Sequence, residues 1–402
     1  MADVDFYFQR FGGREPLIAA APAKDLRMVV VVPSHDEPDL VGSLASLQEC
    51  DPPGGSLEVI VVVNSSGTAE AAVKARNAAG AVAAREWFAA LSLRRFQLHV
   101  VEFSDLPRKH AGVGLARKIG MDEAVRRLAR AGRDEDGVIV CYDADCRCDT
   151  NLLTAIQRWF DEHPSSPGCS VYFEHPLDGP DDRINAAIEQ YELHLRYYIE
   201  ACRYAGHPFA FHTIGSSMAV TVGAYVRQGG MNRRQAGEDF YFLQKLIPLG
   251  EFGEVNDTRV IPSPRISHRV PFGTGRAVGD CCRAEATELP SYPLAAFADL
   301  RDYFQDVERL PRGLLGDFLT EQRLGERLRE IRSQTGDERA FRKRFFRWFD
   351  AFMLMKWVHY SRDHRYGAPP VREAAEQLRA ELGGAGETGL LEWYRRRQRA
   401  AT

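Results

Sequence analysis

The sequence contains no apolar run of the roughly 20 residues that a membrane-spanning helix needs. Its longest apolar runs, such as residues 28–33, have only the length of a strand. Residues 1–10 include Asp3 and Asp5 and lack the apolar core of a secretory signal. These absences exclude a helical membrane protein, and we expect no secretory signal and a cytoplasmic location.

Basic charge is not in excess either, because 52 Lys and Arg stand against 56 Asp and Glu, a formal net charge of −4. Nonspecific binding to nucleic acid needs a basic surface, so we expect no nucleic-acid partner. None of the eight cysteines shows the paired C-x-x-C spacing of a structural zinc site. In the cytoplasm we expect them to be reduced thiols.

Buried strands and helices alternate through the first third of the chain. Strands are predicted at residues 28–32, 57–63, 96–103 and 137–142, and helices between them at 40–47, 69–91 and 111–130. Continuous β-branched runs of this kind indicate strands that are buried on both faces. The pattern predicts an α/β fold with a mostly parallel central sheet.

After residue 150 the sequence predicts helices mixed with short strands, and after Arg283 it predicts helices. We expect helices at 152–160, 184–204 and 239–247, a strand at 169–173, and short strands around Gly215 within 212–221. Two further short strands are expected within 252–262, turning at Asn256-Asp257. The C-terminal region has no strand signal, and residues 341–360 read as one helix.

Acidic residues follow the strand at 137–142, where Asp143-Ala144-Asp145 stands at its carboxyl end. Ligands of open α/β sheets bind beyond this end of the strands. Two carboxylates there suit a hard divalent ion such as Mg²⁺ or Mn²⁺, which completes its shell with water and phosphate oxygens. The alternative is an acidic, solvated loop.

Two other segments carry candidate chemistry, each with a structural alternative. Glu238-Asp239 begins a predicted helix, where acidic residues also serve simply to cap the helix and complement its dipole. His268 stands in Ser267-His268-Arg269, and an imidazole suits a divalent site, although a single histidine is more often structural.

Five segments in order resemble the motifs of family 2 glycosyltransferases. They are VVVVPSHDEPD (29–39), VIVVVNSSGT (59–68), GVGLARKIG (112–120), the segment 141–145 with Asp143 and Asp145, and GGMNRRQAGEDF (229–240). Asn64 replaces the usual aspartate of the second segment, and Lys118 replaces an asparagine of the third. The blocks AGVGLARKIGMDEA, YELHLRYY, HTIGSSM and RVPFGTG are similar to a bacterial branch of the family whose acceptor is not assigned.

The resemblance implies a GT-A-type α/β/α sandwich over residues 1–283, followed by a helical C-terminal extension at 284–402. It implies a nucleoside-diphosphate sugar as donor. The residues expected near the donor are Pro33, His35, Glu37, Asn64, His110, Arg117, Asp143, Gly215, Ser216 and Arg269. Of these, Arg269 would act with Arg265 and the loop at 273–275 as a lid over the diphosphate.

The resemblance also implies a metal and a base. Asp145 would be the main ligand of Mn²⁺ or Mg²⁺, with Asp143 beside it and His268 as a third ligand. Asp239 would take the proton of the acceptor hydroxyl, and Glu238 would hold Asp239 or the acceptor. One base and an in-line attack predict inversion at the anomeric carbon. The acceptor, whether a glycan, a lipid-linked or a small molecule, stays open.

Two other functions are weighed against this one. A noncatalytic nucleotide-sugar-binding or assembly protein is motivated by Asn64 and Lys118. A sugar-nucleotide pyrophosphorylase would need a phosphate loop rich in glycine and lysine after the first strand, where Ser34-His35-Asp36-Glu37 stands instead. The Gln-x-x-Arg-Trp signature of processive polysaccharide synthases is absent, which favours transfer of a single sugar.

The C-terminal region leaves one choice open. Residues 341–360 combine a basic start with many aromatic residues, and the aromatic helix at 184–204 contains Tyr191, His194, Tyr197 and Tyr198. Packing in a core is the first interpretation of both. The alternatives are a peripheral membrane contact through the C-terminal helices and an acceptor groove lined by the rings of 184–204.

Overall fold

The computed structural model describes the chain except for residues 1–2, 13–14, 268–272, 284–287, 385–388 and 402. The chain forms two compact units. The first contains residues 1–184, 213–279 and 399–402, and the second contains residues 185–212 and 280–398. The domain boundary expected near residue 283 stays a prediction. Within the described residues, every helix is too short or too polar to cross a membrane.

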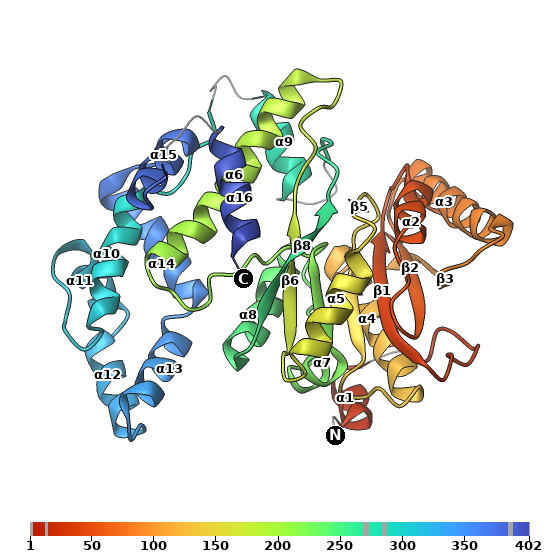
Figure 1. Ribbon diagram of the computed structural model, residues 1–402, viewed down its shortest axis with the longest axis horizontal. Coiled ribbons are helices and arrows are strands. Elements are labelled where there is room, and N and C mark those ends of the chain that lie inside the picture. Colours follow the sequence, from red (N-terminus) through yellow and green to blue (C-terminus); the bar gives the residue numbers. More distant parts are fainter. Residues whose placement is uncertain (1–2, 13–14, 268–272, 284–287, 385–388, 402) are drawn as a thin grey trace. The chain divides into compact units, whose positions relative to one another are not determined.

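The first unit is built on one eight-stranded sheet with the order β3-β2-β1-β4-β7-β6-β8-β5 (Figure 1). The pairs β1–β2, β2–β3, β1–β4 and β6–β8 are parallel, so the expected mostly parallel α/β sheet is confirmed. Its first half consists of β1 (Leu26–Ser34), α2 (Leu40–Gln48), β2 (Ser56–Ser66), α3 (Ala71–Ala90), β3 (Gln97–Leu106), α4 (Val113–Arg130) and β4 (Val138–Cys141).

The order of these strands places the helices on both faces of the sheet. The chain runs outward from β1 through β2 to β3 and then returns to β4 on the other side of β1. Right-handed crossovers put α2 and α3 on one face and α4 on the other. Valines 29–32 of β1 are fully buried between these layers, as their continuous β-branched run predicts.

The second half of the sheet contains most of the antiparallel pairs. Its elements are β5 (Arg147–Cys148), α5 (Leu152–Glu162), β6 (Gly168–Phe173), β7 (Met218–Thr221), α7 (Val222–Arg227), α8 (Glu238–Leu246), η1 (Ile247–Leu249), β8 (Gly253–Ile261) and α9 (Thr274–Arg283). Strand β7 runs antiparallel to both β4 and β6, and β5 runs antiparallel to β8.

Two strand predictions in this half were wrong. The expected pair of short strands at 252–262 is the single strand β8, because β6 and β5 pair with it on both sides. An irregularity in the β6–β8 ladder, between Val171 and Phe173, accommodates Asn256-Asp257 without a turn. Only β7 forms within 212–221, and Gly215 lies in the loop before it.

The N-terminus adds a short helix, α1 (Val4–Arg10), which the sequence analysis did not predict. The Tyr7 hydroxyl donates a 2.6 Å hydrogen bond to Asp122 on α4. Lys118, also on α4, donates to the Tyr7 oxygen at 2.8 Å and pairs with Asp122 at 3.0 Å. The unusual Lys118 therefore holds α1 against α4.

The second unit is helical in its described residues, as expected. It contains most of α6 (Asp182–Tyr204), followed by α10 (Leu294–Gln305), α11 (Gly313–Glu321), α12 (Leu324–Ser333), α13 (Glu338–Trp348), α14 (Ala351–Ser361), η2 (Arg362–Tyr366), α15 (Val371–Glu381) and most of α16 (Leu390–Ala400). The single helix expected at 341–360 was wrong. Asp350 caps a new helix by accepting a 2.9 Å hydrogen bond from the Met353 backbone N–H, so α13 ends at Trp348.

The aromatic residues of this unit pack inside it. Phe345 and Phe349 of the α13–α14 region are fully buried, and the ring of Phe304 contacts both. On α6 the buried Tyr197 donates a 2.7 Å hydrogen bond to the Tyr292 carbonyl. The rings therefore form a core, as the first interpretation expected. The contact of the C-terminal helices with a membrane stays a prediction.

Candidate active site

The sheet of the first unit reverses its strand order between β1 and β4. Beyond the carboxyl ends of these two neighbouring strands stand His35 and Glu37 on one side and Asp143 and Asp145 on the other. This reversal is where open α/β sheets characteristically bind ligands, because the loops diverge there and leave a crevice. The sequence motifs therefore converge at a topological switch point.

The ends of β1 and β2 are fixed to each other by side chains. His35 Nδ1 lies 2.7 Å from the Asn64 carbonyl oxygen. The Asn64 amide, 2% exposed, donates a 3.1 Å hydrogen bond to the Ser34 carbonyl oxygen. An ionised aspartate has no proton to donate to that carbonyl, so the asparagine at residue 64 has a structural role.

A buried asparagine that sequence reasoning missed supports the same corner. Asn77 of α3 donates a 2.9 Å hydrogen bond to the Asn64 carbonyl oxygen and accepts a 2.8 Å hydrogen bond from the Asp36 N–H. Asp36 has a positive φ of 52°, a conformation that needs such support. An asparagine within the alanine-rich stretch of α3 was the available signal, because asparagine is a poor helix former.

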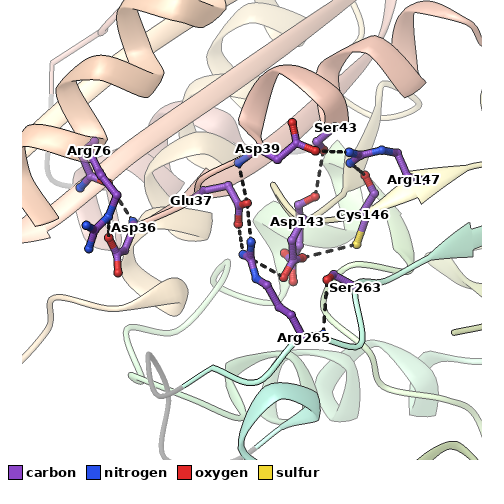
Figure 2. Close-up of polar contacts among 12 residues, drawn as sticks. Asp36, Glu37, Asp39, Ser43, Arg76, Asp143, Cys146, Arg147, Ser263 and Arg265 are labelled. Carbon is purple, nitrogen blue, oxygen red and sulfur yellow. Dashed lines mark hydrogen bonds and ion pairs between the residues drawn. The ribbon is translucent and has the colours of Figure 1, made fainter. Parts of the chain in front are cut away.

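Glu37 forms an ion pair that spans the switch point. Its buried carboxylate accepts a 3.0 Å hydrogen bond from the Asp39 N–H and a fork of hydrogen bonds from Arg265 (Figure 2). Arg265 Nη2 also lies 3.5 Å from Asp145 Oδ2. Arg265 therefore bridges the loops that follow β1 and β4. The resemblance implied only that Arg265 is part of a lid over the diphosphate, and it did not imply this bridge.

A second arginine organises the other carboxylates. Arg117 of α4 is 1% exposed, donates to Asp143 Oδ1 at 2.7 Å and forms a hydrogen-bonded ion pair with Glu238. Asp239 also acts electrostatically on this guanidinium. Three carboxyl groups thus share one cation, so the cluster carries excess negative charge whenever all three are ionised.

Small residues allow these elements to approach. A Cβ on Gly114 would lie 2.2 Å from the Arg234 carbonyl oxygen, so the glycine lets α4 begin beside the loop that leads to Glu238. A Cβ on Gly215 would lie 2.6 Å from Arg117 Nη1. The glycine-rich segment and the loop before β7 are therefore required by the close packing around the guanidinium.

The two acidic residues at the start of α8 have different environments. Burial outweighs the attraction of Arg117 and raises the pKa of Glu238 to about 7. Burial also raises the pKa of Asp239, opposed by Arg117 and by two backbone donors. Those donors are the Gly215 N–H, 2.8 Å from Oδ2, and the Phe240 N–H, 2.7 Å from Oδ1. Both carboxyl groups therefore bind a proton more readily than exposed carboxyl groups do.

The donor set at the switch point fits a hard divalent cation. Asp143 and Asp145 supply carboxylate oxygens, and Mg²⁺ commonly takes one or two carboxylates and fills its shell with water and phosphate oxygens. Among the residues that the structure describes, there is no group of three or more His, Cys, Asp or Glu side chains that could hold a metal ion. His268, the expected third ligand, and Arg269 lie outside the described residues.

Three other residues were expected near the donor, and of these Ser216 interacts with the loop that carries Asp145. Ser216 is buried beside Gly215, and its hydroxyl interacts with the thiol of Cys146, next to Asp145. Pro33 lies within β1, where it pairs in register with Val62. His110 lies in the loop before α4, with its backbone N–H 2.8 Å from the Pro107 carbonyl oxygen. The structure shows no contact between the His110 side chain and the carboxylate cluster among the described residues.

Comparisons with known proteins give weak similarities. No protein-family model and no curated protein matches the chain. The solved structure of S. aureus TarS residues 1–349 in complex with UDP-GlcNAc is similar at 15% identity and a TM-score of 0.41, over 70% of this chain and 72% of that one. Its complex with UDP gives 15% identity and a TM-score of 0.40, over 87% and 91%. At these values the function has to be inferred from the site.

Proposed function

We propose that the protein is a metal-dependent glycosyltransferase that moves one sugar from a nucleoside-diphosphate sugar to an acceptor hydroxyl, with inversion. The observation that carries this proposal is the gathering of Glu37, Asp143, Asp145, Glu238 and Asp239 around two arginines at the β1–β4 switch point. The order of the five sequence motifs supports it independently.

The donor is proposed to lie over the carboxyl ends of β1 and β4. Asp145 and Asp143 would hold Mn²⁺ or Mg²⁺ there, and the cation would neutralise charge that develops on the departing diphosphate. Arg265 already lies against Asp145 and is positioned to exchange Glu37 for a phosphate. The nucleobase and the sugar stay open.

Asp239 is proposed as the base. Its two backbone donors fix the carboxylate, and a pKa raised by burial makes it a stronger proton acceptor than an exposed aspartate. The acceptor hydroxyl gives its proton to Asp239 as its oxygen bonds to the anomeric carbon. The bond from that carbon to the diphosphate breaks on the opposite side, so the configuration inverts.

The two departures from the family pattern do not favour a noncatalytic protein. The Asn64 amide donates to the Ser34 carbonyl oxygen, and Lys118 pairs with Asp122, so both residues have structural roles. The acidic residues of the motifs, Asp143, Asp145 and Asp239, are present. No specific observation favours a pyrophosphorylase.

The donor assignment is tested by thermal unfolding with a panel of UDP-, GDP- and dTDP-sugars, with and without Mn²⁺. At least one donor should raise the Tm by mass action, and Mn²⁺ should increase the shift. A panel without any shift would overturn the assignment of a nucleotide-sugar donor. A donor-induced shift that Mn²⁺ leaves unchanged would overturn the metal dependence.

The base is tested by Asp239→Asn, which keeps the size of the side chain. We expect the donor-induced Tm shift to persist and sugar transfer to fall by at least about 100-fold, the lower range for general-base catalysis. Asp136→Asn is the matched control, because the Asp136 side chain is 58% exposed and pairs only with the nearby Arg133 in the described contacts. Transfer near the original rate in Asp239→Asn would show that another group is the base.

A further inference from the structure

Two cysteines from distant parts of the first unit meet beside the candidate site. Cys50 follows the end of α2, and Cys148 lies in β5. Their sulfur atoms are 3.5 Å apart, although the residues are separated by 98 positions in the sequence. Both are free thiols in the structure. A disulfide needs a sulfur–sulfur distance of about 2.0 Å, so closure requires a movement of about 1.5 Å.

The backbone around the two thiols is already fixed on both sides. The Asp51 N–H donates a 2.7 Å hydrogen bond to the Thr150 carbonyl oxygen, which ties the residues after each cysteine together. Ser46 of α2 accepts a 2.9 Å hydrogen bond from the Cys148 N–H. These contacts hold the Cys50 and Cys148 side chains against each other, so rotation of the side chains is the main movement left for closure.

The two sulfur atoms differ in reactivity. Cys50 is 1% exposed, whereas Cys148 is partly open to solvent. Hydrogen bonding from the Cys50 thiol, followed by Ser46 and Tyr142, lowers the pKa of Cys148. The same contact, together with burial, raises the pKa of Cys50. Cys148 is therefore the thiol that is closer to solvent and ionises more readily than Cys50, and Cys50 is placed to resolve its oxidised form.

We propose that Cys50 and Cys148 form a reversible disulfide when a hydroperoxide oxidises Cys148. The Cys148 thiolate attacks the peroxide oxygen, which gives a sulfenic acid and releases an alcohol, or water from hydrogen peroxide. The Cys50 sulfur then attacks the Cys148 sulfur and expels the sulfenic oxygen as water. In sum, two thiols and one hydroperoxide give one disulfide, one alcohol and one water.

The bridge would act on the segment that carries the candidate site. Ser43 of α2 donates a 3.3 Å hydrogen bond to the Asp143 carbonyl oxygen, so α2 already contacts the loop between β4 and β5 (Figure 2). A covalent link from the end of α2 to β5 restrains that loop from its other end. This inference does not depend on the proposed function, because the chemistry needs only the two thiols and the oxidant.

The test oxidises the full-length protein with a small molar excess of hydrogen peroxide, denatures it and counts its thiols. The wild type should fall from eight thiols to six, and dithiothreitol should restore all eight. Peptide mass spectrometry should find Cys50 joined to Cys148. The Tm of the oxidised protein should be higher than that of the reduced protein, because the bridge closes a long loop.

Variants separate this pair from the other cysteines. Cys50→Ser should form no bridge and should accumulate a Cys148 sulfenic acid that dimedone traps. The matched control Cys281→Ser/Cys282→Ser removes two partly exposed thiols elsewhere and should still lose two thiols on oxidation. The proposal is overturned if the oxidised wild type keeps eight thiols, or if the thiols that it loses come from other cysteines. It is also overturned if oxidation of Cys50→Ser removes as many thiols as in the wild type and dithiothreitol restores all of them.

Discussion

Arg117 is the sole described arginine that contacts both Asp143 and Glu238, and its replacement tests how the carboxylates are held. We consider Arg117→Met, which keeps a long side chain and removes the charge. Glu238 is 2% exposed, so the variant leaves a buried carboxyl group without its cation. Breaking a buried pair in this way costs about 3–5 kcal/mol of unfolding free energy near neutral pH.

The pH dependence of that loss follows from the pKa of Glu238. In the wild type it is raised from 4.5 to about 7, so the folded state binds more protons than the unfolded state between these values. Stability therefore falls as the pH rises through this window, and the fall ends near pH 7. Arg117 lowers this pKa, so the variant extends the window above pH 7. Between pH 7 and 8 the variant should lose up to about 1.4 kcal/mol, against about 0.4 kcal/mol for the wild type, whose Glu238 is still partly protonated at pH 7.

Hydrogen exchange is the suitable assay, because the chain has two compact units and a single unfolding curve mixes them. Peptides from α4 and α8 report the opening of the first unit at pH 5 to 8. The double variant Arg117→Met/Glu238→Gln removes the Glu238 carboxyl group and should lose part of the extra fall in stability above pH 7, because Asp239, whose pKa Arg117 also lowers, still titrates. The reasoning is refuted if Arg117→Met shows no extra fall in stability there, or if the double variant loses as much stability over this range as Arg117→Met does.

Three other substitutions test single contacts. Gly215→Ala places a methyl group 2.6 Å from Arg117 Nη1, and we expect a loss of about 1–3 kcal/mol, measured by hydrogen exchange of peptides from the first unit. Asn64→Asp restores the residue usual in the resembling family but removes the donor to the Ser34 carbonyl. It should cost about 1–3 kcal/mol in the same assay and should not strengthen donor binding measured by calorimetry. Asp350→Ala removes the cap of α14 and should cost about 1 kcal/mol, measured by exchange of α14 peptides.

Strong local patterns predicted most of the fold. The continuous apolar runs at β1 and β2 identified buried parallel strands, because only strands covered on both faces tolerate such runs. The errors came where tertiary pairing overrides local preference. Asn256-Asp257 is a typical turn sequence, yet it lies inside β8, where the β6–β8 ladder pairs residues on both sides of it. Likewise, the apolar residues on both sides of Asp350 concealed the cap that divides α13 from α14.

The candidate site was predictable as a set of motifs but not as a set of contacts. Motif order indicated that Asp143, Glu238 and Asp239 act together, and the structure brings them around Arg117. The ion pair of Arg265 with Glu37 joins residues 228 positions apart. Single-sequence patterns contain periodicity and local spacing, whereas such a pair is set by how the loops after β1 and β8 fold over the sheet.

The residues that depart from the family pattern show how a substitution at a site can be structural. At residue 64 the side chain faces the Ser34 carbonyl oxygen, and an amide can donate to it where a carboxylate would repel it. At residue 118 an ammonium meets Asp122, which also accepts from Tyr7 and Tyr225 and so needs a cation. Each substitution supplies the proton or charge that its surroundings lack. The acidic residues around Arg117 are therefore the better guide to chemistry.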